Sequence, residues 1–172
     1  MTMPEGLERA LPEIVGRDMF DALVIRTDFS DDESWKAVVG ELRRPYGPAG
    51  EFPARVQIVD VPAWSGATAD EVLAAVDADE DLSVVFLADR ETMQSPAWAL
   101  LALTTTWEDE SDLDPVYYQE LIESPEPREF RAAPAAVHDV HANLTLGNLD
   151  FADFAEFAEA AAAEPDQVLR PV

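Results

Sequence analysis

The sequence predicts an α/β fold: a single domain with a central, mostly parallel sheet of four or five strands, flanking helices and a C-terminal helix. Three apolar runs rich in Val and Ile predict the first strands. A segment with helical spacing between successive runs gives a β-α-β-α-β order with right-handed crossovers. Because parallel strands end at one edge of a sheet, the aspartates that end these runs should gather there. The runs are 22–28, 54–60 and 82–89, and the aspartates are Asp28, Asp60 and Asp89.

The two helices between these strands have recognisable start signals. Ser30 and Glu33 have the spacing of a capping box, and so do Thr68 and Glu71. Pro45 ends the first helix. The apolar face of the first helix is Trp35, Val38, Val39 and Leu42, Arg43 and Arg44 suit its C-terminal dipole, and the second helix buries Val72, Leu73 and Val76.

The second half of the chain has weaker patterns. Asp150 is expected to cap a last helix, whose apolar face carries Phe151 and Phe154. The other expected elements are a fourth strand at 98–106, a helix from Asp114 to about 123, a fifth, edge strand at 129–133 and a helix at 135–146. The predicted boundaries are an N-terminal extension at 1–20, the α/β domain at 21–164 and a tail at 165–172.

Composition limits the class of protein. The 172 residues suit one domain, and 48% hydrophobic residues can form a core. The absence of cysteine excludes disulfides and thiolate metal sites. No apolar run approaches the ~20 residues of a membrane span, and the first residues lack the features of a signal peptide. We therefore expect a soluble, cytoplasmic protein.

The formal charge is −25, from 36 acidic and 11 basic residues. Such a surface repels nucleic acid and anionic membranes, so neither is an expected partner. Three interpretations of the acidity remain: a solvated surface that favours solubility, an acidic face for a basic protein partner, and adaptation to high salt.

Asp28, Asp60 and Asp89 are the leading candidates for a site. Converging carboxylates can hold Mg²⁺, or divide acid and base roles between them. Alternatively, each aspartate only begins a loop or caps a helix. A phosphotransfer site would normally add a lysine or a glycine loop for phosphate. The only lysine, Lys36, lies on the first predicted helix, and no such loop is present.

Two arginines, Arg26 and Arg90, flank these aspartates. Arg26 lies in an apolar strand, where an unpaired charge is costly, so we expect it to pair with Asp28, Asp60 or a carboxylate on a helix. Either the pair is structural, or the arginines bind an anion at the sheet edge. Asn148 and Asp150 are interpreted as loop and cap residues, or as the rim of a site.

The only histidines, His138 and His141, share a helix face. Zinc would need further ligands that no nearby residue supplies, so surface or half-buried histidines are expected and no metal site is predicted here.

Several short motifs resemble an uncharacterised bacterial family of small α/β proteins, common in actinobacteria and known only as a domain of unknown function. The motifs are Arg26-Thr-Asp-Phe-Ser-Asp-Asp32 with Trp35, Val59-Asp-Val-Pro62, Ala88-Asp-Arg90 and Asn143-Leu-Thr-Leu-Gly-Asn-Leu-Asp-Phe-Ala-Asp-Phe154. The resemblance implies the α/β fold and a bacterial cytosolic origin, and implies no activity.

Three hypotheses for function follow. The first is a non-enzymatic protein that binds a basic protein partner, as an immunity or antitoxin-like factor or a regulatory accessory. The second is a hydrolase or phosphotransfer protein that uses Mg²⁺ at Asp28, Asp60 and Asp89; only this hypothesis implies a cofactor. The third is a sensor of a small anion near Arg26 and Arg90. The sequence leaves the oligomeric state open.

Overall fold

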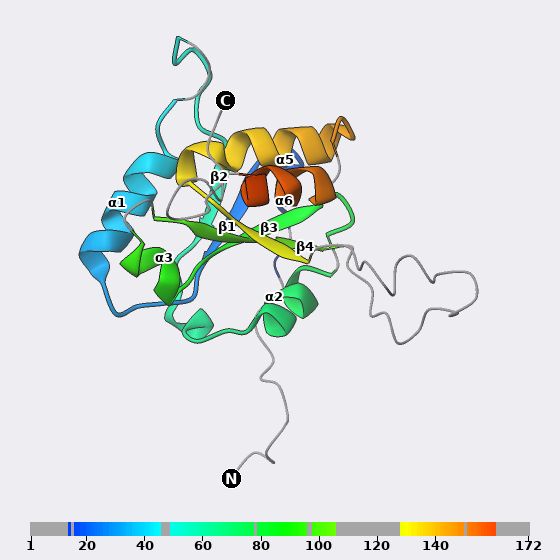
Figure 1. Ribbon diagram of the computed structural model, residues 1–172. Coiled ribbons are helices and arrows are strands. Elements are labelled where there is room, and N and C mark those ends of the chain that lie inside the picture. Colours follow the sequence, from blue (N-terminus) through cyan, green and yellow to red (C-terminus); the bar gives the residue numbers. More distant parts are fainter. Residues whose placement is uncertain are drawn as a thin grey trace.

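A computed structural model describes residues 14, 16–45, 49–77, 79–95, 98–105, 128–149 and 151–160. Within them the predicted α/β class is confirmed: helices surround a central five-stranded sheet with the strand order β2-β1-β3-β4-β5 (Figure 1). The strands are β1 (Ala22–Arg26), β2 (Val56–Val59), β3 (Val84–Ala88), β4 (Leu100–Thr104) and β5 (Glu129–Ala132). The helices are α1 (Asp32–Leu42), α2 (Ala69–Val76), α3 (Arg90–Gln94), α5 (Val137–Leu146) and α6 (Phe151–Ala160), with short 3₁₀ turns η1 (Pro62–Trp64) and η3 (Pro134–Ala136).

The sheet is mixed, which corrects the prediction of a mostly parallel sheet. β1 pairs in parallel with β2 and with β3, whereas β4 is antiparallel to both β3 and β5. The reason lies in the link after β3. A parallel neighbour needs a long crossover, but the described residues between β3 and β4 hold only the short helix α3, and β4 runs back beside β3.

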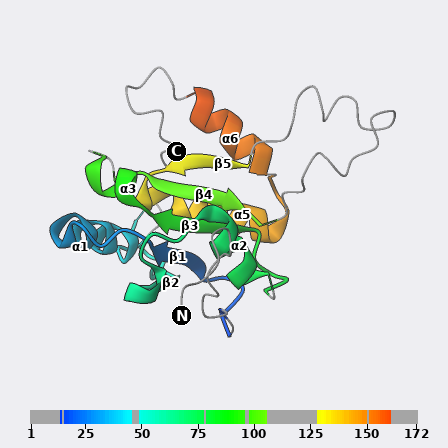
Figure 2. The same cartoon turned by 90° about the horizontal axis from the view of Figure 1, so that it is seen from below.

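Helices cover both faces of the sheet. α1, α5 and α6 lie on one face and α2 lies on the other (Figures 1 and 2). Each face of the sheet has its own hydrophobic core, and strand β1 contributes to both. Ala22 and Val24 pack against α1 and α5, while Leu23 and Ile25 pack against α2 and Trp64. Such burial on both faces explains why the central strands are continuous apolar runs without alternation.

The two predicted capping boxes have different outcomes. Thr68 and Glu71 form theirs at α2, with a bond from each backbone N–H to the other side chain. At α1 the predicted Ser30–Glu33 box is wrong, because Asp31 is the N-cap and its carboxylate accepts from the Ser34 N–H at 3.0 Å. The Ser30 hydroxyl instead donates to the Asp28 carboxylate, and an ionised carboxylate is the stronger acceptor for a helix N-terminus.

The last two helices pack on different parts of the sheet: α5 contacts β1 and β3, and α6 contacts β5. α5 ends at Gly147, whose φ of 74° is the left-handed conformation that glycine adopts without strain. α6 packs on β5 through Phe130, whose ring centroid lies 4.9 Å from that of Phe151 and 6.4 Å from that of Phe154. The predicted helix at 114–123, the cap Asp150 and the tail at 165–172 lie outside the described residues.

Part of the predicted N-terminal extension packs on the domain. Ile14 is buried beside α2 and its N–H donates to the Ala75 carbonyl at 3.2 Å. Arg17 forms an ion pair with Asp79 at 2.8 Å. No helix in the described part of the chain combines the length and the hydrophobicity that crossing a bilayer requires.

Candidate functional site

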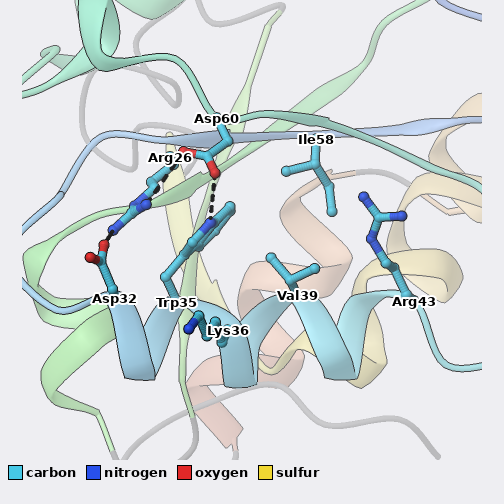
Figure 3. A pocket seen from close by; sticks show the side chains of 8 residues that line it. All are labelled: Arg26, Asp32, Trp35, Lys36, Val39, Arg43, Ile58 and Asp60. Carbon is cyan, nitrogen blue, oxygen red and sulfur yellow. Dashed lines mark hydrogen bonds and ion pairs between the residues drawn. The ribbon is translucent and has the colours of Figure 1, made fainter.

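A pocket of about 470 Å³ lies between helix α1 and the edge strand β2, and we refer to it as the α1–β2 pocket (Figure 3). Helix α1 forms one side, and β2 with the end of β1 forms the other. Its lining combines charged and apolar side chains: Arg26, Asp32, Trp35, Lys36, Val39, Arg43, Ile58 and Asp60.

The periodicities of the two elements place these side chains on one surface. Positions 32, 35, 36, 39 and 43 recur at three- and four-residue intervals, so they follow one side of α1. Ile58 and Asp60 are two residues apart at the end of β2 and therefore face the same side of the strand. The local sequence thus produces a strip of alternating polar and apolar groups along the helix.

Arg26 closes one end of the pocket. Its Nε donates to the Asp28 carbonyl at 2.9 Å, and its two Nη atoms pair with Asp32 at 2.7 Å and Asp60 at 3.4 Å. The guanidinium carbon lies 4.3 Å from the ring centroid of Phe29 and 5.1 Å from that of Trp35. The ion pair expected for this strand arginine is therefore present, and it leaves the buried guanidinium little capacity to bind a further anion.

Asp60 is fixed by the same network. One carboxylate oxygen accepts from Arg26, and the other accepts from the indole Nε1 of Trp35 at 3.1 Å. Trp35 is 5% exposed, so its indole is a rigid wall between the polar end of the pocket and the apolar centre formed by Val39 and Ile58.

Lys36 and Arg43 differ from most cations of the protein. Both are exposed, and neither forms an ion pair with another of the residues that the structure describes; among the described basic residues, this is otherwise true only of Arg90. The paired cations are Arg17, Arg26, Arg44, Arg55, Arg128 and Arg131. Two of the three described cations without an acidic partner therefore border one pocket, in a chain whose formal charge is −25.

Asp28, Asp60 and Asp89 follow β1, β2 and β3, and these parallel strands end at the same edge of the sheet. Their carboxylates nevertheless have separate partners: Ser30 for Asp28, Arg26 and Trp35 for Asp60, and Arg131 for Asp89. Among the described residues, no three acidic or histidine side chains are grouped so that they could hold a metal ion. Each of the three carboxylates therefore has contacts of its own at this edge, and a magnesium site at Asp28, Asp60 and Asp89 stays a prediction.

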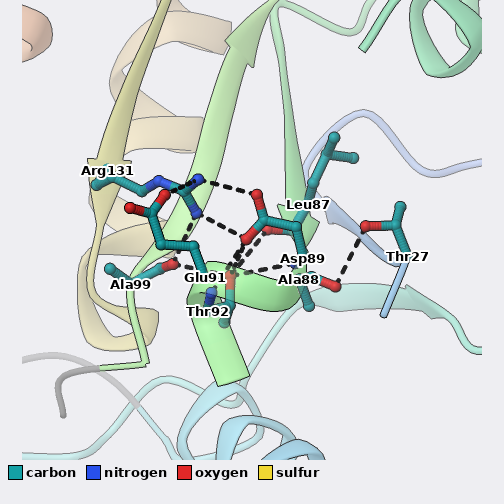
Figure 4. Close-up of polar contacts among 8 residues, drawn as sticks. All are labelled: Thr27, Leu87, Ala88, Asp89, Glu91, Thr92, Ala99 and Arg131. Carbon is teal, nitrogen blue, oxygen red and sulfur yellow. Dashed lines mark hydrogen bonds and ion pairs between the residues drawn. The ribbon is translucent and has the colours of Figure 1, made fainter. Parts of the chain in front are cut away.

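Asp89 belongs to a polar cluster beside α3 (Figure 4). It caps that helix by accepting from the Thr92 N–H and hydroxyl, both at 3.0 Å, and it receives two bonds from Arg131, which also pairs with Glu91. Burial alone would raise the pKa of Asp89, but the hydrogen bonds and charge of Arg131 outweigh it and hold that pKa below its ordinary value. The cluster is consistent with a structural ion pair.

The remaining candidates do not border the pocket. Arg90 is exposed at the first position of α3, and Asn148 donates to Asn143 at the end of α5. The two histidines, expected at the surface or half-buried, are instead buried on α5, where Nε2 of His141 lies 2.9 Å from the Met19 carbonyl.

Burial lowers the pKa of both histidines, although hydrogen bonds with the backbone of Leu42 and Met19 act in the opposite direction. We therefore interpret His138 and His141 as neutral core residues that hold α5 against neighbouring backbone.

Sequence reasoning did not identify Lys36 or Arg43 as site residues. The sequence alone indicates only that Lys36 lies on a predicted helix and that Arg43 suits the dipole of that helix. The signal that could have found them is their seven-residue spacing around Val39, which puts two cations on one helix face of a very acidic chain.

Comparison with protein-family models gives one finding. A model described as a domain of unknown function (DUF6924) matches residues 21–171. This confirms the resemblance stated above, while the bacterial origin that it implied stays a prediction. A search of curated proteins found no match.

Proposed function

Because this chain belongs to the DUF6924 family, a domain of unknown function, we propose its function from the site itself: it binds a small anionic organic molecule in the α1–β2 pocket. The observation that carries this proposal is the position of Lys36 and Arg43, two cations without an acidic partner among the described residues, at the same pocket.

The pocket has the composition of a small-molecule site. Ligand pockets are commonly about 300–1,000 Å³, with apolar walls and a few polar groups that fix orientation, and this one is about 470 Å³. Val39, Ile58 and the side of Trp35 supply apolar surface, while Lys36 and Arg43 supply charge. An arginine can bind a carboxylate or phosphate through two parallel bonds, and a lysine adds a point charge.

The proposed anion site does not use Arg26 and Arg90, the two arginines that the sequence favoured for this role. Arg26 already pairs with Asp32 and Asp60, and Arg90 is not part of the pocket lining. Arg26 contributes indirectly, because it holds Asp60 and the adjacent Trp35 wall in place.

Binding should be measured as thermal stabilisation by a panel of carboxylates and phosphate esters. A ligand at about ten times its Kd stabilises the native state by ~1.4 kcal/mol and raises the Tm of a domain of this size by roughly 3–6 °C. The Lys36→Gln, Arg43→Gln double variant should lose the response, whereas Arg90→Gln, which removes an exposed cation elsewhere, should keep it. A response that survives in the double variant, or a panel without any response, would contradict the proposal.

A basic protein partner is a second candidate, favoured by the charge of −25. Oppositely charged surfaces accelerate association, and salt weakens that attraction. A pull-down at low salt tests this candidate, and recovery of the protein alone would contradict it.

A further inference from the structure

We infer that the ligand of the α1–β2 pocket is an elongated dianion, an aliphatic dicarboxylate with one carboxylate at each end and an apolar middle. The inference rests on the anion-binding function proposed above and adds the shape and charge of the ligand.

The two pocket cations without an acidic partner among the described residues start from well-separated positions on the helix. Lys36 and Arg43 are seven positions apart on α1 and its C-cap, which corresponds to about 10 Å along the helix axis. Figure 3 shows them on either side of Val39 along α1, with the Arg43 guanidinium extended toward β2 and the Lys36 side chain close to the helix. A single compact anion such as phosphate would suit converging cations, whereas separated cations suit two anionic groups on one molecule.

The surface between the cations is apolar. Val39 lies on the same helix face, and Ile58 faces it from β2 (Figure 3). Both side chains are half-buried. A polar middle segment would lose hydrogen bonds to water here without replacement, which costs free energy, so a hydrocarbon chain is the favoured occupant.

The acidic end of the pocket limits the length of the ligand. The Asp32 and Asp60 side chains are 78% and 46% exposed and lie beyond Trp35 from the apolar centre. A carboxylate that extended past Lys36 toward them would be repelled. The ligand should therefore span the distance from Lys36 to Arg43 and no further, which predicts an optimum chain length.

Isothermal titration calorimetry of the full chain with three acids tests this inference. Azelate has seven methylene groups between its carboxylates, so its extended length is close to the rise of about 10 Å from position 36 to position 43. Succinate is a much shorter dicarboxylate, and nonanoate has the same chain length as azelate but only one carboxylate. We expect azelate to bind about tenfold more tightly than either of the others, because each charge-assisted bond contributes about that factor.

Single variants identify the two ends. Lys36→Gln and Arg43→Gln should each reduce the affinity for azelate to about that of nonanoate, while Arg90→Gln should leave it unchanged. Both substitutions are at exposed positions, and circular dichroism with a thermal melt verifies that the variants are folded.

The outcomes distinguish the proposed anion binding from the more specific proposal of a dicarboxylate ligand. Equal affinities for azelate and nonanoate, both lost in the double variant, would overturn the dicarboxylate while leaving anion binding in place. No heat with any of the three acids, together with no response in the wider anion panel, would overturn both.

Discussion

Arg131 on β5 and Asp89 at the end of β3 form a two-bonded ion pair across β4, the strand that separates them (Figure 4). The Nη1–Oδ1 and Nη2–Oδ2 distances are 2.8 and 2.9 Å. Arg131 also donates to the Ala99 carbonyl, just before β4. One side chain therefore ties the antiparallel part of the sheet to the last parallel strand.

Replacement of Arg131 by glutamine should lower the free energy of unfolding by about 2 kcal/mol, the range for partly buried hydrogen bonds to charged groups. Arg44→Gln is the matched control, because it removes an arginine from the exposed helix pair with Glu41, and it should cost less than about 0.5 kcal/mol. Urea denaturation measures both, and equal effects would contradict a special role for Arg131.

Arg26→Lys should also destabilise the protein, by about 2 kcal/mol, although it preserves the charge. The guanidinium reaches three separate acceptors, Asp28, Asp32 and Asp60, which a single ammonium cannot match. Because Asp60 would lose an anchor, intrinsic fluorescence should report a change near Trp35. A variant with wild-type stability and fluorescence would show that the network does not order this end of the pocket.

The two histidines should make the stability of the protein depend on pH. The pKa values of His138 and His141 are lowered in the folded state, mainly by burial. At pH values between the folded and unfolded pKa, the unfolded chain therefore binds more protons than the folded one. The contribution of the two histidines to stability is complete above the unfolded pKa of about 6.5, and it falls as the pH drops toward their pKa values in the folded state.

NMR titration of the two imidazole rings measures this directly, since the chain has no other histidine. Midpoints at or above 6.5 would contradict the assignment. A His141→Gln variant, which can keep the bond to Met19, should show a weaker loss of stability between pH 6.5 and 5 than the wild type.

Magnesium should not stabilise the protein specifically. Asp60 and Asp89 are committed to Arg26 and Arg131, and a cation would have to displace these arginines. We expect Mg²⁺ and NaCl of matched ionic strength to change the Tm equally. A larger shift with Mg²⁺ that disappears in Asp60→Asn would contradict this and support the metal-dependent hypothesis.

The central strands and α2 were predictable because the residue patterns that specify them lie within each segment. Continuous Val- and Ile-rich runs identify strands that are buried on both faces, and the Thr68–Glu71 spacing alone specifies the capping box. The direction of β4 was not predictable in the same way, since it depends on how α3 turns the chain back onto β3. The predicted cap of α1 was wrong because both Ser30 and Asp31 could serve as N-cap. The carboxylate of Asp31 takes this position because it is the stronger hydrogen-bond acceptor.

The candidate site was only partly predictable. The strand-end pattern predicts Asp60 at a sheet edge, and the structure has a pocket beside it; the cost of burying a charge predicts the carboxylate partner that Arg26 has. What the sequence could not provide was which arginines pair with which carboxylates. Lys36 and Arg43 become distinctive only when the remaining described cations, except Arg90, are seen to have acidic partners.

Because Lys36 is the only lysine, reductive ¹³C-methylation, which keeps the positive charge, gives one side-chain NMR signal beside that of the terminal amine. This signal provides the most direct test of anion binding in the α1–β2 pocket. Titration with azelate should shift the Lys36 signal to saturation, and Arg43→Gln should weaken the titration while Arg90→Gln does not. A Lys36 signal that stays unchanged through the titration, or shifts equally in Arg43→Gln, would contradict the account.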